Sequence, residues 1–277
     1  MRGKTVVITG GTSGIGAVAA TRLAQQGARI VLVARDQARA ETTLQALKTA
    51  NPSVLHTVYF ADLSRLAEMR RVGAEIAAAE PSIDVLVNNA GGYFSQHQLN
   101  GDGLERMFAT NHMAYFVLTN LLLERLKAAP GGRVVSTSSD AHRGRTLNFE
   151  NLQAAGGFAA YGNSKLCNIL FTRELARRLA GTRVTANCLH PGFVATRFGD
   201  NAGGLMSGVM SLLKRVMAIS PEEGAKTIVY LASSPEVQDK SGGYYVKCAP
   251  VKPAPAALND ADAKKLWEVS ERIGGSE

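Results

Sequence analysis

Two residues near the middle of the chain, Tyr161 and Lys165, could form an acid–base pair. Residues four apart share one face of a helix, and the pattern predicts a helix that continues through Leu166–Leu179. A phenol titrates near pKa ~10, which is too high for efficient proton transfer at neutral pH. We expect the Lys165 ammonium to lower the pKa of Tyr161 by about 1–3 units. Alone, this spacing is weak, since two surface residues of any helix can show it.

A glycine-rich segment, Thr9–Gly16, is the second feature with chemical potential, and it lies between an apolar run and a helical pattern. Gly10 permits a sharp turn, Gly14 lets backbone approach a pyrophosphate, and Gly16 permits close helix–strand packing. The helix start offers unpaired N–H groups and a partial positive charge to an anion. The context predicts a dinucleotide-binding loop, with an ordinary glycine turn as the alternative.

Strand-like apolar runs alternate along the chain with helical patterns, which predicts crossover connections and a parallel sheet. Continuous Val, Ile and Leu runs are typical of strands that are buried on both faces. We predict one doubly wound α/β domain of the Rossmann type over residues 1–277, with about seven strands and helices on both faces. Ligands of such sheets bind at the carboxyl ends of the strands. The strand candidates are Thr5–Thr9, Arg29–Ala34, Val54–Ala61, Val85–Asn88, Arg133–Ser138, Arg183–His190 and Gly243–Lys247.

The composition excludes several classes of protein. Of 277 residues, 45% are hydrophobic and 19% charged, which is typical of a folded globular chain. The formal net charge is +8, but the basic residues are scattered, so we expect no nucleic-acid partner. The three cysteines are odd in number and widely spaced, which argues against a disulfide framework and favours a reducing, cytoplasmic location. None has a CxxC partner, so no metal site is suggested. No apolar run is long enough to predict a transmembrane helix.

The glycine spacing G-x-x-x-G-x-G, preceded by Thr9, resembles the short-chain dehydrogenase/reductase family. The resemblance covers nearly the whole chain. Three segments, Ser138–His142, Ser164–Leu179 and Lys265–Ser270, are similar to the branch of retinol dehydrogenases and WW-domain oxidoreductase-like proteins. Many retinol dehydrogenases carry an N-terminal membrane anchor, whereas this chain opens directly on its first predicted strand. The branch implies a lipophilic alcohol, aldehyde or ketone as substrate.

The resemblance also implies roles for further residues in catalysis. It implies that Ser139 orients the substrate oxygen, while Ser138 is a cofactor-side or structural hydroxyl. Asn111 lies within a predicted long helix that ends at Leu126, where asparagine is a poor helix former. The family's asparagine at this place holds a water that links the lysine to solvent. Lys165 is implied to hold the nicotinamide ribose as well.

The second predicted strand ends in Ala34 and Arg35, and this ending bears on the choice of dinucleotide. NAD-binding folds usually place an acidic residue there, to accept from the ribose 2′-hydroxyl. In the family that acid would fall at Ala34, whereas Arg35 has a fork suited to a 2′-phosphate. Asp36 is acidic, but we expect it to cap the following helix, Gln37–Thr49. We therefore predict NADP(H) as the preferred cofactor, with NAD(H) as the alternative.

Further cofactor contacts are implied at the ends of later strands. Asp62 matches an aspartate that, in the family, accepts a hydrogen bond from the adenine amino group. The segment Asn88–Gly91 resembles the family's NNAG element. A Pro-Gly turn after the sixth strand would bring backbone against the carboxamide. The full set of expected cofactor contacts is Gly10, Thr12, Ser13, Gly14, Ile15, Gly16, Arg35, Asp62, Leu63, Asn88, Ala90, Gly91, Tyr161, Lys165, Pro191, Gly192, Val194 and Thr196.

A Met- and Leu-rich stretch at about 197–219 is expected to form a lid on the substrate pocket, with plain core packing or contact with a membrane surface as alternatives. Tyr93, Phe94, Phe149 and Phe193 are further pocket candidates, and His142 and His190 are expected to be structural. The predicted partner is a small carbonyl or alcohol substrate, and a homodimer is left open. The alternatives to alcohol–carbonyl interconversion are reduction of a conjugated C=C bond and a catalytically silent NADP-sensing protein.

Overall fold

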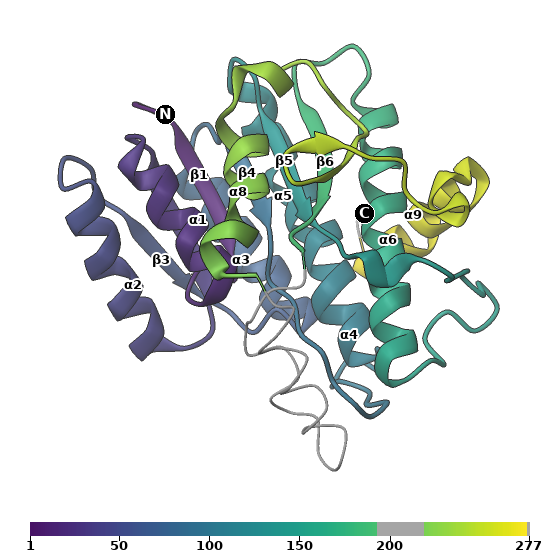
Figure 1. Cartoon of the computed structure of the whole chain (residues 1–277). Coiled ribbons are helices and arrows are strands. Elements are labelled where there is room, and N and C mark those ends of the chain that lie inside the picture. The colour runs from purple at the N-terminus through teal and green to yellow at the C-terminus, as the bar shows by residue number, and fades with distance from the viewer. Residues whose placement is uncertain (193–218, 276–277) are drawn as a thin grey trace.

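The apolar runs of the sequence form the strands of one sheet, ordered β3-β2-β1-β4-β5-β6-β7-β8 (Figure 1). The computed structural model describes residues 1–192 and 219–275. Within these ranges β1 to β7 run parallel, and β8 pairs antiparallel with β7. The strands are β1 (Thr5–Thr9), β2 (Arg29–Ala34), β3 (Thr57–Phe60), β4 (Val85–Asn88), β5 (Arg133–Thr137), β6 (Thr185–His190), β7 (Tyr244–Val246) and β8 (Ala249–Pro250).

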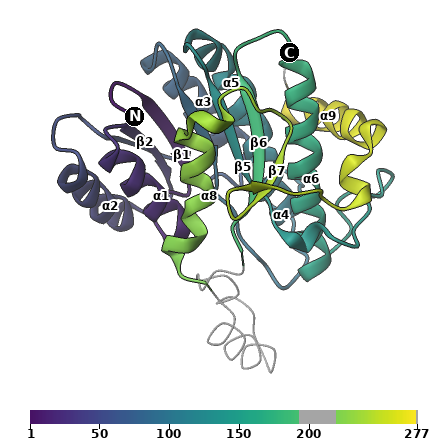
Figure 2. The ribbon, with the colours of Figure 1, turned by 45° about the horizontal axis from the view of Figure 1, so that its top comes forward.

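Helices cover both faces of this sheet (Figures 1 and 2). Helices α1, α2 and α8 pack side by side on one face, whereas α3, α5 and α6 cover the other, with α9 against the outer side of α6. The main helices are α1 (Gly14–Gln25), α2 (Gln37–Ala50), α3 (Leu66–Ala79), α4 (Arg106–Phe108), α5 (Ala114–Ala128), α6 (Gly157–Arg178), α8 (Pro221–Ser233) and α9 (Asp260–Gly274). The predicted doubly wound α/β fold is confirmed.

Alternation along each strand divides the core between the two layers. Val6 and Ile8 of β1 pack under α1 and α8, whereas Val7 packs under the helices of the other face. Because side chains on both faces of the strand are buried, its sequence is a continuous apolar run. The strand order reverses between β1 and β4, so their connections leave the sheet on opposite faces. Such a reversal opens a crevice at the carboxyl ends of the strands.

Four predicted strands are shorter in the structure: β5 and β7 differ by one residue at an end or at both ends, and β3 and β6 differ by more. Of the run predicted at 54–61, only Thr57–Phe60 forms β3. Leu55 is exposed, and at the next residue the His56 side chain, rather than a backbone carbonyl, accepts the N–H of the neighbouring strand β2. Nδ1 of His56 accepts the Ile30 N–H at 3.0 Å. The run predicted at 183–190 begins only at Thr185.

An eighth strand, which the sequence did not predict, follows a tight turn after β7. Lys247 (φ 51°) and Cys248 (φ 63°) both adopt the left-handed backbone conformation, so the seventh strand ends at Val246 rather than at Lys247. The Cys248 N–H donates to the Thr227 hydroxyl and ties this turn to α8. Two paired residues then form β8.

The predicted lid lies outside the described residues, apart from Ile219, and so do Phe193, Val194 and Thr196. Among the helices that the structure describes, none is both long and apolar enough to cross a membrane.

Candidate active site

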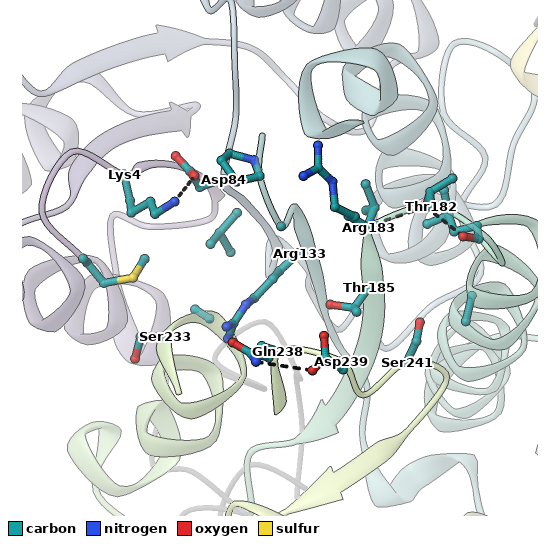
Figure 3. Close-up of a pocket in the computed structure, with 18 of the residues that line it drawn as sticks. Lys4, Asp84, Arg133, Thr182, Arg183, Thr185, Ser233, Gln238, Asp239 and Ser241 are labelled. Carbon is teal, nitrogen blue, oxygen red and sulfur yellow. Dashed lines mark hydrogen bonds and ion pairs between the residues drawn. The ribbon is translucent and has the colours of Figure 1, made fainter. Parts of the chain in front are cut away.

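Two cavities lie at opposite ends of the parallel strands. One, of about 770 Å³, opens among the amino ends of the strands, where Lys4 pairs with Asp84 at 2.8 Å near Arg133 and Arg183 (Figure 3). Its described lining holds none of the residues predicted for catalysis or cofactor binding. Two of its polar groups serve the fold: Lys4 neutralises Asp84, and Arg133 donates to the carbonyl oxygens of Leu231 and Ser234.

The other cavity, of about 590 Å³, lies at the carboxyl ends of the strands and gathers the predicted residues. This is the edge at which doubly wound sheets bind ligands. The structure therefore selects this cleft as the candidate active site. The predicted residues that line it are Gly10, Ser13, Gly14, Ile15, Ala90, Gly91, Ser139, Tyr161, Lys165, Pro191 and Gly192.

The glycine loop between β1 and α1 forms one wall of the cleft. Gly10 (φ 66°) and Gly14 (φ 53°) adopt left-handed conformations that L side chains rarely occupy. A Cβ on Gly16 would collide with the Gly10 carbonyl and lie 2.5 Å from the Asn89 amide nitrogen. The Ser13 side chain makes no capping hydrogen bond to α1, so within the described residues the N–H groups of the first turn are available to an anion at the cleft. Thr12 is half-buried in the same loop.

Asn89 joins the glycine loop to the end of β4. Its Nδ2 donates to the carbonyl oxygens of Thr9 (3.3 Å) and Gly10 (3.2 Å), and the Thr9 hydroxyl accepts the N–H groups of Asn89 and Ala90. Asn88, which the sequence proposed instead, is buried and its Nδ2 donates to Thr119 on α5. Asn89 is thus the asparagine that lines the cleft, a residue that was absent from the predicted set.

The ends of β2 and β3 place Arg35 near Asp62. Asp36 caps α2 as predicted, because its side chain accepts the Arg39 N–H at 2.9 Å. Burial alone would raise the pKa of Asp62, but hydrogen bonds from the Ser64 N–H and hydroxyl outweigh it. The charge of Arg35 contributes too, so the pKa of Asp62 lies below its ordinary value. Leu63, the next residue, is buried in the core.

Helix α6 begins at Gly157, four residues before Tyr161, and carries both members of the predicted acid–base pair. Tyr161 is half-buried, whereas Lys165 is only 4% exposed. The Lys165 Nζ lies 5.5 Å from the centroid of the Tyr161 ring and donates to the Thr137 carbonyl at 3.2 Å. The two residues share one face of the helix, as their spacing predicts.

The prediction that Lys165 brings the pKa of Tyr161 below its ordinary value is wrong. Burial raises the pKa of Tyr161 to about 12, although a hydrogen bond with Ser139 opposes this rise. Burial also lowers the pKa of Lys165 to about 8. The physical reason is that both groups lose water in the cleft, while the ammonium is directed toward the Thr137 carbonyl.

Asn111 lies in a π-helical turn, Ala109–Met113, which separates α4 from α5 within the helix that the sequence predicted. Such turns are frequent at functional sites. The amide Nδ2 of Asn111 donates to the Gly92 carbonyl and to the Ser164 hydroxyl, both at 3.0 Å, while Oδ1 accepts the Gly92 N–H at 2.8 Å. A Cβ on Gly91 would lie 3.1 Å from Oδ1 and 3.6 Å from the Lys165 Nζ, which places both groups around one small space.

The two serines at the end of β5 have different surroundings. Ser138 is buried and its hydroxyl donates to the Lys165 carbonyl at 2.7 Å, which is a structural role. Both serines line the cleft, but the Ser139 Oγ accepts the Ala141 N–H at 3.2 Å instead of donating to the helix backbone. Of the two hydroxyls, that of Ser139 is therefore the better placed to contact a substrate.

Aromatic side chains surround the Tyr161 ring. Tyr93 packs edge-on at 6.1 Å between ring centroids, and Phe158, which is 55% exposed, lies at 6.3 Å. Phe158 lines the cleft but was not among the predicted pocket residues. Two predicted ones contact other groups: Phe94 packs under Arg106, and Phe149 under Lys265.

A family model described as short chain dehydrogenase matches residues 4–203. The chain belongs to this family. Human retinol dehydrogenase 14 is 40% identical to it, over 99% of this chain and 87% of that protein, which supports the retinol dehydrogenase-like branch. A putative uncharacterized protein from Mycobacterium Paratuberculosis superposes with a TM-score of 0.80 at 32% identity, over 100% of this chain and 95% of that one. A putative short chain dehydrogenase from Shigella flexneri, solved in complex with NADP, superposes with a TM-score of 0.71 at 20% identity, over 90% and 98%, and shares the fold.

As a short-chain dehydrogenase of this branch, the protein is an NAD(P)(H)-binding oxidoreductase, and its relatives support alcohol–carbonyl chemistry. Across residues 1–192 and 219–275, no group of three His, Cys, Asp or Glu side chains could hold a metal ion.

Proposed function

We propose that this short-chain dehydrogenase uses NADP(H) to interconvert a lipophilic alcohol and its aldehyde or ketone, with Tyr161 as general acid and base. One observation carries the proposal. Ser139, Tyr161 and Lys165 come from the end of β5 and from α6, and they line the same cleft as the glycine loop. A proton donor and a hydroxyl thus lie beside a site for an anionic cofactor.

The cleft fits a dinucleotide. Small residues at Gly10, Gly14 and Gly91 line it, and the uncapped start of α1 supplies N–H donors for a pyrophosphate. When bound, the cofactor supplies or accepts the hydride at its nicotinamide ring. Every other requirement of the reaction falls to the residues of this chain.

Ser139 and Tyr161 would hold the substrate oxygen between them. The Ser139 Oγ already accepts a backbone N–H, so its hydrogen is free to point elsewhere, and it forms a hydrogen bond with Tyr161. A carbonyl oxygen that enters between the two hydroxyls would accept from both. Tyr161 then transfers its proton as negative charge develops on that oxygen, which is the point at which fixed donors stabilise a transition state.

Lys165 and Asn111 would return the proton to Tyr161. Both amide donors of Asn111 are used by Gly92 and Ser164, which leaves one lone pair of Oδ1 beside the Lys165 ammonium for a water. With a pKa of about 8, Lys165 is mostly charged at neutral pH and can exchange a proton in this range.

The preference for NADP(H) follows from the position of Arg35. Arg35 is exposed directly after β2, where a ribose 2′-phosphate would lie, and Ala34 leaves no carboxylate at the strand end to accept from a 2′-hydroxyl. Asp36 is occupied by capping α2 and lies 3.7 Å from the Arg39 side chain. Arg35 is thus available to pair with a phosphate.

The deciding experiment follows oxidation of NADPH and NADH in parallel against a panel of aliphatic and aromatic aldehydes and ketones. We expect turnover with NADPH and hydrophobic carbonyls, and its loss in Tyr161→Phe while NADPH binding persists. Retained turnover in Tyr161→Phe would refute the role of Tyr161. Conjugated enals and enones belong in the panel, because saturated carbonyl products would indicate C=C reduction. NADPH binding without turnover of any compound would favour a sensor.

A further inference from the structure

The turn that carries Ser139 is short and is held from outside itself. Ser139 caps a single 3₁₀ turn, Asp140–His142, and its hydroxyl oxygen accepts the Ala141 N–H. A Cβ on Gly162 of α6 would lie only 2.5 Å from the Ala141 carbonyl, so the turn packs directly against the helix that carries Tyr161. One turn of 3₁₀ helix has few bonds of its own, and its geometry depends on its neighbours.

His142 joins this turn to the chain segment that follows β8. Its Nε2 accepts the Ala254 N–H at 3.0 Å, so the ring hydrogen must be on Nδ1. Nδ1 then donates to the Ser139 carbonyl at 2.7 Å. The side chain is fully buried, and its ring packs edge-on against Tyr244 at 5.2 Å. Burial lowers the pKa of His142, which keeps the imidazole neutral and both bonds intact at neutral pH.

Three further contacts hold the same turn. The Tyr244 hydroxyl donates to the Asp140 carboxylate at 3.0 Å, and the Asp140 N–H donates to Nδ1 of His190 at 3.3 Å. Arg143 donates to Asp140 at 3.1 Å from within the same loop. Of these groups, only His142 bonds the main chain of Ser139 itself.

We propose that His142 is a positioning residue for Ser139: by bridging the Ser139 carbonyl to the Ala254 N–H, it sets the direction in which the serine hydroxyl enters the cleft. The proposal rests on the proposed role of Ser139 in catalysis. The Ala254 N–H then supports the position of Ser139 through His142, although Ala254 does not line the cleft.

The test is a double-mutant cycle between His142→Phe and Ser139→Ala, measured on carbonyl reduction with NADPH. Phenylalanine keeps a ring against Tyr244 but removes both hydrogen bonds. If His142 acts through Ser139, His142→Phe lowers kcat by about 10- to 100-fold, as expected for a misplaced catalytic group. KM for NADPH stays within about twofold, since the glycine loop is untouched. In the Ser139→Ala background the same change has little further effect on kcat.

His56→Phe is the matched control for loss of a buried, doubly bonded imidazole. His56 accepts the Ile30 N–H and contacts the Asn51 carbonyl at 3.2 Å, far along the sheet from Ser139. We expect it to lower the melting temperature without changing kcat. If His142→Phe does not fold, His142→Leu, which is smaller and likewise removes both hydrogen bonds, replaces it in the cycle.

Three results overturn the inference: an unchanged kcat in folded His142 variants, losses that multiply in the double variant, or an equal loss in His56→Phe. Full activity of Ser139→Ala alone would instead overturn the role of Ser139 in the proposed function, so the two failures are distinguishable.

Discussion

The Lys165 ammonium donates to the main-chain oxygen of Thr137 at the end of β5, and this bond sets where the lysine sits in the cleft. Asn168, one turn later on α6, donates to the same oxygen at 3.1 Å. The carbonyl therefore keeps a partner when the lysine is replaced. The strand end holds the Lys165 ammonium, and its charge is costly because the side chain is almost fully buried.

We predict that Lys165→Met abolishes turnover and stabilises the free protein. Burial lowers the pKa of Lys165 from 10.5 to about 8, which corresponds to a cost on the order of 3 kcal/mol for the charged form below pH 8. Methionine removes this cost, and the Thr137 carbonyl keeps its bond from Asn168. The free energy of unfolding should rise by about 1–3 kcal/mol at pH 7, as measured by denaturant titration without cofactor.

The pH dependence of the free energy of unfolding also tests whether burial of the Lys165 charge destabilises the protein. Between pH 8 and 10.5 the unfolded chain holds a proton on this lysine that the folded chain lacks, so wild-type stability gains from Lys165 as pH rises through this window. The variant should lack that gain. Lys127→Met, at an exposed lysine paired with Glu124, is the control and should leave stability nearly unchanged. A loss of stability in Lys165→Met would contradict the burial argument.

Gly16→Ala should block the cofactor site. A Cβ there would meet the Gly10 carbonyl and the Asn89 amide, so the loop must open or α1 must move away. Overpacking of this kind costs about 1–3 kcal/mol, and NADPH binding should weaken at least ~10-fold by fluorescence titration. Gly131→Ala is the matched control, since its Cβ would meet nothing within 4 Å. Normal NADPH affinity in Gly16→Ala would show that this packing is irrelevant to binding.

Arg35→Ala should change the choice between the two dinucleotides. Loss of a charge-assisted contact with a 2′-phosphate should raise KM for NADPH by about 10-fold or more, with KM for NADH within about twofold. The ratio of kcat/KM for the two cofactors is the measurement. Equal effects on both would refute the assignment of Arg35 to the 2′-phosphate.

The raised pKa of Tyr161 predicts a different pH dependence for each direction of the proposed reaction. Because the pKa is about 12, the phenol is protonated across the neutral range, and this is the form that carbonyl reduction consumes. Alcohol oxidation needs the phenolate, whose fraction grows with pH. We expect kcat/KM for oxidation to rise between about pH 7 and 10, and for reduction to stay level from about pH 6 to 8. A reduction rate that climbs with pH would contradict this.

The layout of the sheet and most of the cleft could be predicted because their signals are local. Continuous apolar runs identified the main strands, and the spacing of Tyr161 and Lys165 placed both on one helix face. The eighth strand could not be predicted, since two residues, one of them proline, carry no alternation. Nor could the sequence decide which of Asn88 and Asn89 lines the cleft. Successive side chains of a strand point to opposite faces of the sheet, so a shift of one residue at the strand end exchanges the two.

Features that depend on distant contacts were beyond the sequence. The bond between His142 and Ala254 joins residues 112 positions apart. The pKa of Tyr161 depends on how much water the folded cleft removes, a quantity that no spacing of residues conveys, and so the expected lowering by Lys165 had the wrong sign.

The middle of α6 has consequences for how the enzyme can adapt. Every residue from Ser164 to Thr172 is buried, between the sheet and α9. Amides in such a helix exchange with solvent only when much of the domain opens, so this stretch should be among the last to take up deuterium. Tyr161 therefore lies one turn from a fully packed stretch of helix, and we expect new substrates to be accommodated more readily at the exposed end near Phe158 than by changes along the helix.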